Sequence, residues 1–242
     1  LYLLYRRGSW GRSLTALLYQ YHIYVGRIKL LKFKEPFNGF SHLVGALLSV
    51  VGLIALVYQA IKYFGPVHIV SFSIYGASLI LLYSASSIYH LIPASKKATK
   101  TLRIIDHMMI YVLIAGSYTP LFLISLKGKL GIGLLVAVWS IAFIGIATTG
   151  LSLKAPRWVA PLIYSAMGWL SVITLPTLIP AITLRGFAWL LAGGLFYSIG
   201  AVIYGTKRPK FTSRVIGFHE IFHLFVLAGS ACHYFLIFKY VA

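Results

Sequence analysis

Two histidines one helical turn apart, His219 and His223, open an otherwise apolar stretch near the end of this 242-residue chain. On a helix their side chains project from the same face, so this spacing suits two imidazoles on one metal ion. Ionisable side chains within apolar helices are costly, and they usually pair, face a protein interior or serve a function. The stretch therefore predicts part of a metal site that needs a further ligand.

Membrane helices are the elements that must position these residues. Hydrophobic residues make up 60% of the chain and charged residues only 10%, against roughly 25% in ordinary soluble domains. Long uncharged runs of about 20 residues alternate with short basic loops. We predict an all-α membrane protein with seven transmembrane helices, at about 40–61, 67–92, 104–126, 130–151, 158–179, 187–204 and 216–240.

The 22 lysines and arginines are distributed unevenly between the two sides of these predicted helices. Seventeen lie in residues 1–34 and in the loops after the second, fourth and sixth helices, and five lie on the other side. Cytoplasmic loops attract Lys and Arg, so we predict a cytoplasmic N-terminus and a C-terminus outside. Residues 1–34 are predicted to be a basic cytoplasmic or interfacial segment, and residues 35–242 the seven-helix domain.

In a soluble protein, a net charge of +19 would indicate a nucleic-acid partner. Here the positive charges lie between membrane helices, which predicts no nucleic-acid partner. We expect instead membrane lipids as partners, with anionic headgroups on the cytoplasmic face. The sequence does not identify any protein partner, and this question stays open.

With this topology the chain's three acidic residues and five of its histidines fall in one inner-leaflet layer. The second helix ends there with Ser86 and His90, and the third begins there with Asp106. His90 is the candidate third ligand for the His219 and His223 pair. Three imidazoles leave a fourth zinc position open, as in catalytic sites. Asp106 is a candidate to take a proton from water there, and Ser86 to hydrogen bond near the metal or a substrate oxygen.

Other interpretations of these residues stay open. The same side chains could form a polar network between helices without a metal. Glu220 completes the pattern His-Glu-x-x-His, in which the glutamate is the general base, but it could instead pair with a basic residue such as Arg103. His233 lies about 21 Å beyond His219 along a helix, so we expect a hydrogen-bonded core histidine. His107 points about 100° away from Asp106 and is not expected to be a ligand.

Several motifs together resemble the progestin and adipoQ receptor family in its bacterial hemolysin III branch. They cover residues 35 to about 240 and are Glu35-x-x-Asn38-x-x-Ser41-His42, Ser86-x-x-x-His90, Asp106-His107, Ala115-Gly116-Ser117-Tyr118-Thr119-Pro120 and His219-x-x-x-His223. The pattern is also similar to alkaline ceramidases. The resemblance implies zinc on His90, His219 and His223, with Asp106 near the zinc-bound water and Ser86 assisting. Glu35, Asn38, His42 and Glu220 are candidates for the surroundings of this site.

Three functions remain open at this point. The first is a zinc-dependent, ceramidase-like hydrolase of an amide or ester bond in a membrane lipid. The second is a cytolytic or pore-forming protein, as the branch name suggests, although a channel needs polar rings that these helices lack. The third is a receptor-like protein of membrane homeostasis with structural zinc. Each predicts a multi-pass protein of the plasma membrane, here a bacterial inner membrane.

Overall fold

The structure, a computed structural model, describes residues 33–151, 159–210 and 216–241. By its internal contacts the chain divides into two units, Leu1–Phe33 and Lys34–Ala242. Within the described residues every regular element is helical, as predicted. The basic segment predicted for residues 1–34 falls almost wholly outside the described ranges and stays a prediction.

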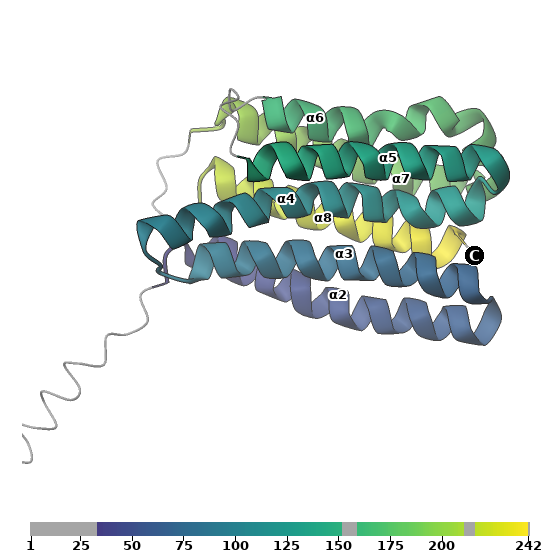
Figure 1. The fold of residues 1–242 in the computed structure, drawn as a ribbon, viewed down its shortest axis with the longest axis horizontal. Coiled ribbons are helices and arrows are strands. Elements are labelled where there is room, and N and C mark those ends of the chain that lie inside the picture. Colours follow the sequence, from purple (N-terminus) through teal and green to yellow (C-terminus); the bar gives the residue numbers. More distant parts are fainter. Residues whose placement is uncertain (1–32, 152–158, 211–215, 242) are drawn as a thin grey trace, which may run out of the picture. The chain divides into compact units, whose positions relative to one another are not determined.

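The first three helices of the second unit are α2 (Pro36–Tyr63), α3 (Pro66–Leu91) and α4 (Lys96–Pro120). Two-residue and four-residue connections join them, and α3 packs against both of its neighbours (Figure 1). Proline opens α2 and α3, because its fixed φ suits the first helical turn. The Ser95 side chain caps α4 by accepting a hydrogen bond from Ala98 N–H at 3.3 Å.

The second half of the unit contains one long interrupted stretch. A π-helical turn, η1 (Leu121–Ser125), follows Pro120 and leads to α5 (Gly128–Gly150). Then α6 (Val159–Gly168), the 3₁₀ turn η2 (Trp169–Thr174) and α7 (Leu175–Thr206) follow one another directly. Within α7 the residue Thr183 leaves helical geometry with a φ of 64°. The last helix is α8 (Phe218–Tyr240).

Six helical stretches of the described residues are long and apolar enough to cross a membrane. Five of them overlap five predicted spans, and the sixth, Val159–Thr206, covers the sixth predicted span and all but the first residue of the fifth. Large apolar side chains face outward, as on α2, where Leu47, Val51 and Ile54 are each more than 60% exposed. The chain is therefore a multi-pass membrane protein.

Helix α8 packs closely between other helices, and small residues allow it. A side chain at Gly193 of α7 would overlap the ring of His233, so this glycine allows α7 and α8 to pack closely. A side chain at Gly45 of α2 would lie 2.8 Å from Leu227 of α8. These contacts place α8 against α7 and α2.

Candidate metal centre

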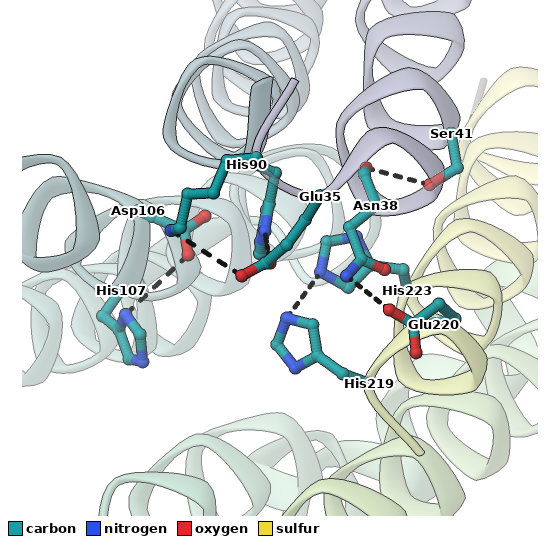
Figure 2. Close-up of polar contacts among 10 residues, drawn as sticks. Glu35, Asn38, Ser41, His90, Asp106, His107, His219, Glu220 and His223 are labelled. Carbon is teal, nitrogen blue, oxygen red and sulfur yellow. Dashed lines mark hydrogen bonds and ion pairs between the residues drawn. The ribbon is translucent and has the colours of Figure 1, made fainter. Parts of the chain in front are cut away.

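Three histidines meet where α3 ends and α8 begins. One ring nitrogen from each of His90, His219 and His223 lies within 4.8 Å of the others, and the Nε2 atoms of His219 and His223 are 3.2 Å apart. His90 is 1% exposed and His223 is 2% exposed. The structure thus brings the three predicted ligands together in a buried cluster that could hold a metal ion (Figure 2).

The chemistry of this cluster, and the distance between its two α8 nitrogens, suit a small ion that prefers nitrogen. Zinc binds imidazole nitrogens at about 2.0–2.1 Å in a tetrahedral arrangement, so two such nitrogens lie about 3.3 Å apart. The 3.2 Å between the Nε2 atoms of His219 and His223 is close to that value. Mg²⁺ and Ca²⁺ prefer oxygen ligands, which this group of three does not contain.

Glu35, the residue before α2, fixes the ring of His90. Its Oε2 lies 2.5 Å from His90 Nδ1, and its backbone N–H donates to the His90 carbonyl at 2.9 Å. The hydrogen bond to His90 is the main cause that lowers the pKa of Glu35 to about 2, so this carboxylate is ionised at neutral pH. An ionised carboxylate only accepts hydrogen bonds, so His90 Nδ1 carries the proton. The other nitrogen, Nε2, is then free for a metal, an arrangement typical of metal-binding histidines.

Replacing Glu35 by glutamine is expected to weaken metal binding by about 10- to 100-fold. Glutamine removes the charge and no longer selects the His90 tautomer that leaves Nε2 free. Competition between the purified protein and a zinc chelator measures the affinity. Ser41→Ala is the control, because the Ser41 hydroxyl donates only to a backbone carbonyl of its own helix, that of Asn38, at 3.0 Å. Its loss should therefore leave the zinc affinity unchanged. Equal affinity of Glu35→Gln and wild type would remove this role from Glu35.

Asn38 and Glu220 connect α2 to the beginning of α8. Asn38 Nδ2 donates to Glu220 Oε1 at 2.8 Å, and the backbone N–H of Gly217 donates to Glu220 Oε2 at 2.8 Å. These bonds cap α8 and hold the turn that carries His219, which directly precedes Glu220. Glu220 lies outside the group of three imidazoles. The ion pair with Arg103 considered from the sequence is not among those of the described residues.

His42 packs directly against the ligand candidate on the second turn of α8. The rings of His42 and His223 stack with centroids 3.9 Å apart, and His42 is 3% exposed. The edge of this ring contacts Tyr83 of α3, with centroids 5.0 Å apart. Residues 35, 38 and 42 are spaced by three and four positions, so they lie on one side of the beginning of α2. Each contacts a ligand candidate or its neighbour in the chain.

A cavity of about 430 Å³ lies beside the histidines, with His90, His219 and Asp106 in its wall. Asp106 accepts a hydrogen bond from the Ser86 hydroxyl, and its Oδ2 is 3.8 Å from His107 Nδ1. Ser86 is buried. Asp106 is not part of the group of three, so it is placed to contact a molecule in the cavity rather than to complete that group.

Two histidines that are not expected to be ligands, His107 and His233, have other partners. His107 Nδ1 donates to the Arg103 carbonyl on its own helix at 2.7 Å. His233 Nε2 donates to the Leu190 carbonyl at 3.3 Å, which confirms a hydrogen-bonded core histidine.

Comparison with known proteins identifies the family. A family model described as haemolysin-III related matches residues 31–234. The chain belongs to the haemolysin-III related family. A Bacillus subtilis protein named hemolysin-3 homolog is 42% identical over 207 residues, which cover 86% of this chain and 94% of that protein. Hemolysin-3 of Bacillus cereus is 39% identical over 86% of this chain and 92% of its own length.

More distant relatives of this haemolysin-III related protein occur in animals. The human monocyte to macrophage differentiation factor is 29% identical over 173 residues, which cover 69% of each chain. The resemblance to the progestin and adipoQ receptor family in its hemolysin III branch is thereby confirmed.

Proposed function

We propose that this protein is a zinc-dependent hydrolase that cleaves an amide or ester bond of a membrane lipid, as ceramidases do. The observation that supports this is a cavity whose wall holds a carboxylate, Asp106, together with His90 and His219, two members of the cluster of three imidazoles. Zinc sites with three protein ligands are typically catalytic, whereas structural sites usually have four. The proposal rests on both the imidazole cluster and the carboxylate. Metal binding by the imidazoles would not by itself require a carboxylate beside them, whereas hydrolysis needs a group that accepts a proton.

Each residue has a defined task in this reaction. His90, His219 and His223 would hold zinc, which when bound polarises a carbonyl and lowers the pKa of water to about 7. Asp106 would accept a proton from the attacking water and return it to the leaving group. Ser86 would orient Asp106 through the hydrogen bond between them. Glu35, Asn38 and His42 would hold the ligand-bearing turns in place.

The proposal also places the cavity at the cytoplasmic side of a bacterial inner membrane. The 48 residues Val159–Thr206 would measure about 72 Å as one straight helix, over twice the roughly 30 Å hydrocarbon core. We therefore take the break at Thr183 as the turn between two spans, which gives seven crossings. The excess of Lys and Arg then places the N-terminus in the cytoplasm and the C-terminus outside. A site near the inner leaflet suits an amphipathic substrate.

A panel of synthetic lipids tests this function. Purified protein would be incubated in mixed micelles with N-acylated sphingolipids and with glycerol esters, and released fatty acid measured by mass spectrometry. We expect release from at least one class, its loss after chelation and its return with added zinc. Zinc-loaded protein that releases fatty acid from none of these lipids would contradict the proposal.

Membrane lysis is a second candidate, because the Bacillus cereus relative is named hemolysin-3. Lysis through a pore would not depend on the three imidazoles. Conductance of liposomes that survives both His219→Ala and His223→Ala would favour this function over hydrolysis. A structural role of zinc makes a third prediction, in which chelation lowers the thermal unfolding temperature although no hydrolysis can be detected.

A further inference from the structure

Arg103 brings a positive charge to the wall of the cavity beside the three histidines. It lies on α4, three residues before Asp106, which borders the same cavity. The Arg103 side chain is exposed, so its guanidinium is accessible to a molecule that enters the cavity.

The chain offers no carboxylate side chain to neutralise Arg103. It has only three acidic side chains, and all three lie in the described residues. Glu35 pairs with His90 and Lys34, Glu220 accepts from Asn38 and Gly217, and Asp106 pairs with His107. None of these three lies within the 4.0 Å of an ion pair with Arg103. An anion that binds the guanidinium therefore has to come from another molecule.

Two lysines extend this charge along α4. Lys96, Lys100 and Arg103 are spaced by four and three residues, so they share one face of the helix, and all three are exposed. Lys97 is also exposed but lies about 100° around the helix from Lys96. Rows of basic side chains near a membrane bind anionic lipid headgroups, and a guanidinium can grip a phosphate with two parallel hydrogen bonds. The row leads to the cavity and ends in its wall.

We propose that the cavity binds the phosphate group of an anionic lipid through Arg103, with Lys96 and Lys100 on the approach to it. The cavity of about 430 Å³ lies within the usual range of small-molecule sites, about 300–1,000 Å³. The lipid that reaches the histidines is then an anionic phospholipid rather than a neutral lipid. Its identity as the substrate rests on the proposed hydrolysis, whereas its binding does not.

Binding to the intact zinc-loaded protein in neutral maltoside micelles tests this site. The probe is dihexanoyl phosphatidylglycerol, with dihexanoyl phosphatidylcholine as the zwitterionic comparison, and calorimetry measures the dissociation constant. We expect Arg103→Gln to weaken binding of the anionic lipid about fivefold. Lys97→Gln removes the same charge from a position outside the row, about 100° around the same helix from Lys96, and should bind like wild type. Arg103→Lys, which keeps the charge without the paired donors, should lie between wild type and Arg103→Gln.

Three results would overturn the proposal: equal affinity of Arg103→Gln and wild type, equal losses in Arg103→Gln and Lys97→Gln, or equal binding of the two lipids. Sodium phosphate at the same concentration should not displace the anionic lipid, and displacement would assign the site to free phosphate instead. Matching thermal unfolding of the variants ensures that a loss of affinity is not a loss of fold. Binding of the anionic lipid without hydrolysis would contradict only the proposed function. Hydrolysis of neutral lipids without binding of the anionic lipid would contradict only the proposed anion site.

Discussion

Protein purified with His90 replaced by alanine should retain less than about a hundredth of the zinc affinity of the wild type. Loss of a residue that merely orients a ligand typically costs about 10- to 100-fold, so loss of a ligand from a group of three should cost more. Elemental analysis by mass spectrometry, after washing with a weak chelator, measures zinc per chain. We expect about one zinc per wild-type chain and almost none in the variant.

The control for His90→Ala lies on the same helix. His68 is in the first turn of α3, stacked on Phe64 at the opposite end from His90. His68→Ala should keep its zinc, whereas His219→Ala and His223→Ala should lose it as His90→Ala does. Unchanged gel-filtration behaviour shows that the variants are folded. Wild-type zinc content in folded His90→Ala would mean that His90 is not a ligand.

Replacing Asp106 by asparagine should lower the rate of lipid hydrolysis by at least about 100-fold while zinc stays bound. Asparagine has nearly the same shape as aspartate but accepts no proton, and general acid–base catalysis contributes about 10²–10⁴ in rate. Zinc should remain because Asp106 is not part of the imidazole group. Initial rates on the best lipid of the panel and zinc content of the same preparations test both statements.

Glu220→Gln separates this account from the His-Glu-x-x-His alternative. The Glu220 carboxylate is already held by Asn38 and by the Gly217 backbone N–H. Glutamine can keep one of these bonds, so we expect a rate within about tenfold of wild type. A large loss of rate in Glu220→Gln together with normal rates in Asp106→Asn would make Glu220 the general base.

The membrane helices could be predicted because the bilayer dictates apolar stretches of defined length. The predicted span 67–92 and the observed α3, Pro66–Leu91, differ by one residue at each end. The long stretch Val159–Thr206 was harder to predict, because the residue with a positive φ at its break is Thr183 and not a glycine or asparagine. Composition predicts two spans in this stretch. It does not predict that the backbone stays helical up to the break at Thr183.

The ligand candidates could be found from local spacing and depth, and the family resemblance named residues around them, but the contacts of those surrounding residues could not be predicted. His219 and His223 are one turn apart, and His90 ends a helix at the same depth. The contacts of Glu35 with His90 and of Asn38 with Glu220 (Figure 2) depend on how α2 packs against α3 and α8. The same holds for the stacking of His42 on His223. The one local signal was the spacing of residues 35, 38 and 42, which places them on one side of a helix but does not name their partners.

X-ray diffraction from crystals of the purified protein, recorded on both sides of the zinc absorption edge, tests the central claim most directly. The account predicts a single anomalous peak about 2.0–2.1 Å from a nitrogen of each of His90, His219 and His223. No peak among these three rings in crystals of zinc-loaded protein, or a peak bound by only two of them, would contradict it.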